Sequence, residues 1–148
     1  MNRYLLPMLL SCIFLVLSIQ AKPSDSKDWF AYAENDLQAA SLLTDAHIIG
    51  CALYHIEQAA EKALKAYLIA TNTDFALTHD LVPLLSSCSK TEPDFNEFTS
   101  DIREINPYST KSRYPNKSYI EPAISSVKSL ILRTTALLYF VRSKIISA

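Results

Sequence analysis

Glycine is nearly missing from this chain of 148 residues, in which Gly50 is the single example. Loops that cradle phosphates, of the P-loop or the dinucleotide-binding type, need several glycines at fixed offsets. One glycine therefore excludes both kinds of site. The sequence also has no Asn-Gly or Asp-Gly pair, which is typical of tight β-hairpins, and no alternating apolar and polar runs. These absences predict an all-α chain.

Cysteine is scarce, and no two cysteines form a Cys-x-x-Cys pair. Zinc-binding and thioredoxin-like functions therefore have no support, and we expect neither a metal ion nor another cofactor. Cys51 and Cys88 would form one disulfide in an exported domain, whereas in a cytosolic domain they would be small buried thiols. Their spacing does not decide between these alternatives.

Charge is absent from residues 4–21, which follow Arg3 and contain a long apolar run. This layout is typical of a secretory signal peptide. Cleavage after Ala21 would put Ile19 where a small residue is preferred, so an uncleaved membrane anchor is the alternative. The stretch is slightly shorter than the ~20 residues that span a bilayer. We assign residues 1–21 to a signal peptide or membrane anchor, 22–27 to a linker, and 28–148 to one helical domain.

The most strongly helical stretch is Ala46 to Asn72, which contains no proline and many good helix formers. One predicted face is apolar: Leu53, Ile56, Ala60, Leu64 and Tyr67. A second face has small side chains that allow close packing: Ala52, Ala59, Ala63, Ala66 and Ala70. Between them runs a polar line of His55, Gln58, Lys62 and Lys65. Helix geometry favours a solvated face here, with Glu61 and Lys65 as an ordinary pair worth a few tenths of a kcal/mol.

Other helices are expected on both sides of this one. An amphipathic stretch covers residues 28–46, and Thr78 is placed to cap a short helix through Cys88, with Asp80 in its first turn. A further helix opens at 92–94 and stops at 106–107. The last runs from about Pro122 to about Ile146. Its apolar seam would pack on a helix of the same chain or of a second copy: Ile120, Ile124, Val127, Ile131, Thr134, Leu138, Val141 and Ile145.

The net charge of −1 conceals an uneven distribution. Residues 22–105 contain fourteen acidic and six basic side chains, whereas residues 106–148 contain one acidic and seven basic side chains. This split indicates one of two arrangements. Either the acidic and basic parts attract each other, within one fold or between the copies of a dimer, or the basic part forms a surface for an anion. The connection 107–119 contributes three basic residues and three tyrosines, and it shows no periodicity. It is either a ligand contact or a surface loop whose tyrosines pack on the core.

Three segments together resemble the HEPN domain, the higher eukaryotes and prokaryotes nucleotide-binding domain. They are YHIEQAAEKALKAYL at 54–68, THDL at 78–81 and RYP at 113–115, ahead of a long final helix. The resemblance covers roughly residue 28 to the end. It implies an up-and-down bundle of four to five helices that is usually a homodimer. It also implies a link to nucleotides or RNA, and frequent pairing with a nucleotidyltransferase, as in toxin–antitoxin systems.

Many HEPN domains are metal-independent ribonucleases, in which an arginine is followed four to six residues later by a histidine. The arginine stabilises charge on the phosphate and the histidine transfers protons. Here the three histidines, His47, His55 and His79, precede every arginine except Arg3 of the leader. The ribonuclease motif is therefore absent. The resemblance then implies the branch whose role is binding.

Six residues match the family's motifs: Lys62, Lys65, His79, Asp80, Arg113 and Tyr114. We expect them to contact a ligand, although a buried His79 that pairs with Asp80 or caps a helix is the structural alternative. The first hypothesis is a non-catalytic binding and dimerisation module that holds a nucleotide or RNA phosphate against Lys62, Lys65 and Arg113.

Two other hypotheses stay open. One is a ribonuclease that uses His79 with Arg113 as an atypical catalytic pair. The other is a helical interaction protein tethered to a membrane through residues 4–21. The leader favours export or membrane anchoring, whereas the resemblance favours the cytoplasm.

Overall fold

The computed structural model describes residues 25–114 and 119–147. The leader expected at residues 1–21 lies outside this part of the chain. The described residues form six α-helices and one 3-10 helix, with no strand among them, which confirms the all-α prediction. In chain order they are α2 (Ser26–Asp45), α3 (Ile49–Ala70), α4 (Leu81–Thr91), η1 (Pro93–Phe98), α5 (Thr99–Ile105), α6 (Tyr108–Lys111) and α7 (Ile124–Ser147).

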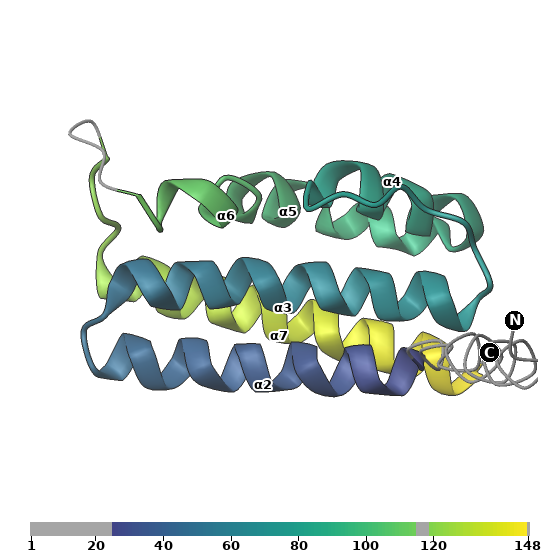
Figure 1. Ribbon diagram of the computed structural model, residues 1–148, viewed down its shortest axis with the longest axis horizontal. Helices are drawn as coiled ribbons and strands as arrows, with labels where there is room; N and C mark the ends of the chain where they lie inside the picture. The colour runs from purple at the N-terminus through teal and green to yellow at the C-terminus, as the bar shows by residue number, and fades with distance from the viewer. Residues whose placement is uncertain (1–24, 115–118, 148) are drawn as a thin grey trace, which may run out of the picture.

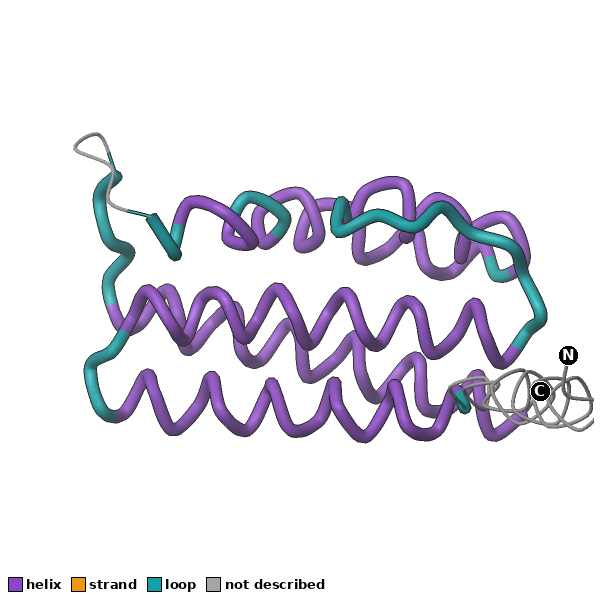
Figure 2. The backbone as a smooth tube through the Cα atoms, in the orientation of Figure 1, coloured by secondary structure: helices purple, strands orange, loops and turns teal. Residues whose placement is uncertain are grey.

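The helices form an up-and-down bundle around α3 (Figure 1). In that view α2 lies along one side of α3, α7 passes behind it, and the segment from α4 to α6 runs along the other side. This last segment is a rod interrupted by short loops, as the tube in Figure 2 shows. Because α3 contacts α2, α4, α5, α6 and α7, it is the helix on which the other elements pack.

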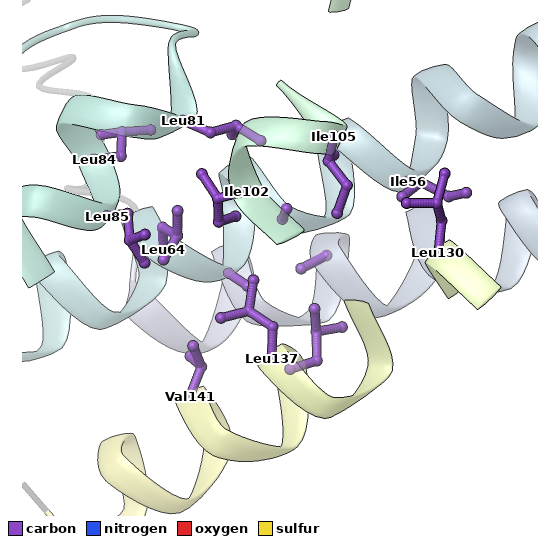
Figure 3. Close-up of a cluster of buried hydrophobic side chains, with 14 of the residues drawn as sticks. Ile56, Leu64, Leu81, Leu84, Leu85, Ile102, Ile105, Leu130, Leu137 and Val141 are labelled. Carbon is purple, nitrogen blue, oxygen red and sulfur yellow. The ribbon is translucent and has the colours of Figure 1, made fainter. Parts of the chain in front are cut away.

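The apolar face predicted for α3 is buried, and so is the small face except for Ala70, which is half-buried. Leu53, Ile56 and Leu64 have no solvent exposure, and neither has Ala52, Ala59, Ala63 or Ala66. Figure 3 shows Ile56 and Leu64 of α3 in a cluster with side chains of α4, α5 and α7. Alanines let neighbouring helices approach closely, so this one helix can be covered on several sides.

The start of α4 differs from the prediction by two residues. Asp80 is the N-cap, since its carboxylate accepts a hydrogen bond from the Val82 backbone N–H at 3.0 Å. The Thr78 hydroxyl instead accepts from the Asp80 backbone N–H at 3.0 Å. An aspartate caps a helix as well as a threonine does, and here the residue nearer to the apolar run takes the position.

The single helix predicted between 92 and 107 is divided into η1 and α5. Within η1 the Asn96 amide donates to the Pro93 carbonyl at 2.9 Å, and the Thr99 hydroxyl donates to the Asn96 carbonyl at 2.7 Å. Such local bonds compete with regular α-helical bonding, and tighter winding is common where a helix begins. The connection predicted to lack periodicity contains the helical turn α6.

The seam predicted on α7 is confirmed for its middle, where Val127, Thr134 and Val141 are buried. It is wrong for Ile120, which precedes the helix and is 89% exposed. Leu130 and Leu137 are also buried, because α7 packs against α2, α3 and α5 at once and therefore buries a wider stripe. By length and composition Ile124–Ile146 could cross a membrane, but in the described structure it is a helix of the bundle.

The basic residues of α7 explain the uneven charge. Arg133 pairs with Asp101 and Glu104 at 2.7 and 2.8 Å. The other three basic side chains pair in the same way with acids of the earlier part of the chain: Arg142 with Glu34, Lys144 with Glu92, and Lys128 with Asp45. For the basic residues of α7, the alternative of an electrostatic fit within the fold is therefore the correct one.

The two cysteines of the domain are unpaired. Cys88 is buried, and burial raises the pKa of its thiol to about 12, so the side chain behaves as a small apolar group. Cys51 is exposed in the first turn of α3, so the expectation of a buried thiol holds for Cys88 alone.

Candidate functional site

A strip of polar side chains runs along α3 between α2 and the rod formed by α4, η1, α5 and α6. We call it the α3 polar strip, and its members are His55, Glu57, Gln58, Glu61, Lys62 and Lys65. Glu57, Glu61 and Lys65 are buried and the other three are partly buried. The predicted solvated face is therefore wrong. Helix spacing alone could not show that α2 and the segment after α3 cover this line.

On the side of the strip that faces α2, Asp36 is the organising residue. Its carboxylate accepts a hydrogen bond from the Lys62 ammonium and lies 2.8 Å from Nδ1 of His55. Asp36 thereby neutralises Lys62, whose side chain is 22% exposed. A phosphate that approaches Lys62 has to compete with this carboxylate.

The centre of the strip is a buried ion pair. The Lys65 ammonium donates to the Glu61 carboxylate at 2.7 Å, and it lies 5.6 Å from the centre of the Trp29 ring of α2. We predicted an ordinary surface pair for these two residues, and this is wrong because both side chains are almost fully buried. Removing one partner from a buried pair leaves an uncompensated charge, which costs several kcal/mol rather than a few tenths.

On the other side of the strip, His79 approaches from the segment between α3 and α4. Its Nδ1 lies 3.1 Å from both carboxylate oxygens of Glu61. A ring nitrogen that faces a carboxylate carries the proton, so Glu61 fixes the tautomer of this imidazole. The His79 side chain is 82% exposed. The structural alternative of a buried His79 that pairs with Asp80 is therefore wrong, because the side chain is exposed and its partner is Glu61.

Glu57 is the most unusual group of the strip. It has no solvent exposure, and its Oε2 accepts from the Gln58 amide at 3.0 Å, while Oε1 has no partner among the described residues. Burial raises the pKa of this carboxyl to about 7. The hydrogen bond from Gln58 and the charges of His79 and Arg113 lower the pKa in part, while the charge of Glu61 raises it.

Asp80, which matches a family motif, is occupied by structural contacts. Besides capping α4, its Oδ1 accepts a hydrogen bond from the Asn106 amide at 3.1 Å. Asn106 in turn accepts from the Leu81 backbone N–H at 2.8 Å. These bonds connect the start of α4 to the end of α5, so the structure places Asp80 as a helix cap and connector.

Arg113 follows α6 in the chain. It lies beside the first turns of α3, at the end of the α3 polar strip that begins with His55. Its guanidinium carbon lies 5.0 Å from the centre of the Tyr54 ring and 5.6 Å from that of Tyr114, and its Nε donates to the Ser109 carbonyl. Unlike the basic residues of α7, it has no carboxylate partner among the described residues. A guanidinium held by aromatic rings keeps donors for an anion.

The single glycine supports this arrangement. A Cβ atom built at Gly50 would lie 3.0 Å from the carbonyl oxygen of Ser112, which is the residue before Arg113. The backbone that carries Arg113 therefore rests directly on the first turn of α3. Glycine is needed here for close approach, since Gly50 does not have a positive φ.

The predicted contacts form a row rather than one cluster. Tyr54, which Arg113 covers, precedes Lys62 by eight residues, or about 12 Å along the helix axis. Lys62 and Lys65 are each neutralised by a carboxylate, whereas His79 and Arg113 both act on the charge of Glu57. The structure thus groups His79 and Arg113 around the acidic side of the strip.

The family model of the HEPN domain matches residues 26–144. This chain belongs to the HEPN domain family. The family comprises nucleotide-binding and ribonuclease-type modules, which is the coarse functional assignment that the match carries. The resemblance inferred from the three sequence segments is confirmed.

Two crystal structures share the fold of this HEPN domain. One is ST0689, described as an archaeal HEPN homologue, with 25% identity and a TM-score of 0.66 over 82% of this chain and 98% of that chain. The other is TT1696 from Thermus thermophilus, with 21% identity and a TM-score of 0.67 over 80% and 97%. At that lower identity the second structure shows the fold alone. No curated protein matches this chain.

Sequence reasoning missed Asp36, Glu57 and the proximity of Trp29 to Lys65. A usable signal existed for the two residues of α2. Trp29 and Asp36 are seven residues apart in the amphipathic stretch predicted at residues 28–46, which is two helical turns and hence the same face. Glu57 gave no comparable signal, because its partners come from distant segments.

Glu57 should make the stability of this HEPN domain depend on pH. The pKa rises on folding from 4.5 to about 7, so the folded state binds a proton that the unfolded state has lost. The free energy of unfolding should therefore fall as pH rises through this range, by up to about 3 kcal/mol. Glu57→Gln should lack this component. The comparison is urea unfolding of wild type and variant at about pH 5 and about pH 8.

Glu97→Gln, at an exposed position of η1, is the matched control and should follow the wild type. Equal pH dependence of the wild type and Glu57→Gln would contradict the predicted role of Glu57.

Proposed function

We propose that this HEPN domain is a non-catalytic module that binds the phosphate of a nucleotide or of RNA through Arg113. The observation that carries the proposal is the guanidinium of Arg113, which lies 5.0 Å from the centre of the Tyr54 ring and 5.6 Å from that of Tyr114, without a carboxylate partner among the described residues. Arginine donates paired hydrogen bonds to phosphate oxygens, which makes it well suited to this ligand.

The aromatic neighbours favour a nucleotide over a free phosphate ion. Tyr114 is 63% exposed and lies beside the guanidinium, where a base could stack on it. Stacking on aromatic rings and on guanidinium planes is a general mode of single-stranded RNA recognition. Lys62 and Lys65 were also expected to contact the phosphate, but the ammonium of each is paired with a carboxylate, so Arg113 alone carries this proposal.

Arg113→Gln should weaken binding of ATP or of a short RNA by about tenfold to a hundredfold, because a charged hydrogen bond contributes about 1.5–3 kcal/mol. Isothermal titration calorimetry measures this. Arg103→Gln removes an exposed arginine of α5 and should bind as the wild type does. No heat with either ligand, or equal affinity of Arg113→Gln, would contradict the proposal.

A second candidate function is a metal-independent ribonuclease that uses His79 with Arg113. The observation in its favour is the orientation of an exposed imidazole by Glu61, together with the influence of His79 and Arg113 on the same Glu57 carboxylate. In such an enzyme His79 would accept the proton of a 2′-hydroxyl, and Arg113 would stabilise charge on the phosphate.

His79→Ala should abolish cleavage of labelled RNA in the presence of EDTA if the domain is this enzyme. His47→Asn is the matched control, because His47 is exposed in the turn after α2 with a φ of 62°, a conformation that asparagine tolerates. Equal cleavage by wild type and His79→Ala would remove this candidate and leave binding alone.

We further propose a homodimer through the face shared by α2 and α7. A groove of about 410 Å³ lies there, with Phe30, Leu37, Ile131 and Leu138 in its lining. Phe30 and Leu138 are buried and the other two are half-buried, whereas Tyr139, which also lines the groove, is 67% exposed. An apolar groove beside an exposed aromatic side chain gives a second copy a surface to pack on. Because the charges of α7 pair within the chain, such a dimer would be held by apolar contacts.

Tyr139→Glu should therefore convert the dimer of residues 22–148 to a monomer in sedimentation experiments. The wild-type dimer should persist when the ionic strength rises from about 0.1 M to about 1 M, since salt screens exposed ion pairs but not apolar contacts. Leu77→Glu, at a fully exposed position outside this face, is the control. A dimer that dissociates in high salt would contradict the apolar interface.

A further inference from the structure

A separate aromatic pocket lies at the start of α2. Its lining consists of Asp28, Trp29 and Tyr32 of α2 together with Lys62 of α3, and its volume is about 320 Å³. Trp29 and Tyr32 are three residues apart, so their rings share one side of the helix. The pocket is at the opposite end of the α3 polar strip from Arg113, because Trp29 lies over Lys65 and Arg113 over Tyr54.

We propose that this pocket binds a nucleobase of single-stranded RNA. The inference rests on the proposed function, to which it adds a base-binding subsite. Two aromatic rings offer the stacking surface that any base can use, and pockets of small ligands are lined mainly by apolar and aromatic groups around a few polar ones. Tyr32 is 64% exposed and thus accessible to a base.

The surface of the pocket is apolar, so stacking rather than hydrogen bonding selects the base. A purine such as adenine has a larger ring system than uracil and should stack more strongly on the two aromatic rings. The Lys62 ammonium stays paired with Asp36, which leaves its alkyl stem to line the pocket. A free anion is therefore a poor occupant, whereas a flat heterocycle fits.

The distance along the strip determines the length of the ligand. Tyr54 and Lys65 are eleven residues apart on α3, which corresponds to about 17 Å along the helix axis. A mononucleotide cannot reach from the aromatic pocket to Arg113. A short single strand can place a base between Trp29 and Tyr32 and a phosphate at Arg113, with the side chains of the strip between them.

Trp29 provides its own assay, because it is the one tryptophan of the chain. Short oligoadenylate and adenosine should quench its fluorescence on stacking, and uridine should quench it less. Tyr32→Ala should lower the affinity for oligoadenylate by about tenfold, since stacking on an aromatic ring contributes about 1–3 kcal/mol per base. Leu42→Ala removes an equally exposed side chain from the same helix, outside both this pocket and the proposed dimer groove, and should bind as the wild type does.

Asp28→Ala should keep the stronger quenching by adenosine than by uridine, because the Asp28 carboxylate does not contribute to the apolar surface of the pocket. Loss of this preference would overturn selection by stacking. Three further outcomes separate this inference from the proposed function. Quenching by adenosine that Tyr32→Ala abolishes, with no effect of Arg113→Gln on RNA binding, would support the base pocket and overturn the phosphate site. RNA binding that depends on Arg113 without any change in Trp29 fluorescence would overturn the pocket alone. No binding of RNA or adenosine would overturn both.

Discussion

The carboxylate of Glu61 is the contact on which the architecture of the strip depends. It holds the Lys65 ammonium under the Trp29 ring and the His79 imidazole at the edge of α4, so one buried group connects α2, α3 and the segment that follows α3. A carboxylate in this position is costly to desolvate and is retained only because charged or polar partners surround it. The neighbouring Glu57 has fewer partners, and burial raises the pKa of its carboxyl to about 7.

Ion pairs with carboxylates engage two groups of basic residues in the described part of the chain. The four of α7 connect the last helix to the acidic first part of the domain, and Lys62 and Lys65 pair within the strip. Arg113 belongs to neither group and lies near two tyrosine rings instead. Most of the positive charge that the structure describes in the final third of the sequence is therefore used within the fold, which net charge alone could not show.

The fold was predictable because its signals are local. Helix periodicity predicted the buried faces of α3 and most of the seam of α7, and the scarcity of glycine excluded the common phosphate loops. The exact caps were not predictable, since Thr78 and Asp80 are both good capping residues two positions apart. The state of the polar line was not predictable either, because Asp36, Trp29 and His79 reach it from other segments, and burial of a charge depends on such tertiary contacts.

In the rest of the candidate site, too, the sequence identified individual residues but not the contacts that they make. Motif resemblance singled out Arg113, Tyr114 and His79, but only coordinates show that the arginine lies on Tyr54 and that the imidazole lies on Glu61. Glu57 was missed altogether, although it follows directly after the buried Ile56. Its pKa results from surroundings contributed by separate parts of the chain, namely α3, the segment before α4 and the segment after α6.

Gly50 shows how a residue with no side chain can govern a distant charge. A Cβ atom at Gly50 would lie 3.0 Å from the carbonyl oxygen of Ser112, so backbone lies against backbone where the segment that carries Arg113 meets α3. Any residue other than glycine would require this segment to move away by a few tenths of an ångström. The position of the Arg113 guanidinium over the Tyr54 ring therefore depends on a residue that has no side chain of its own.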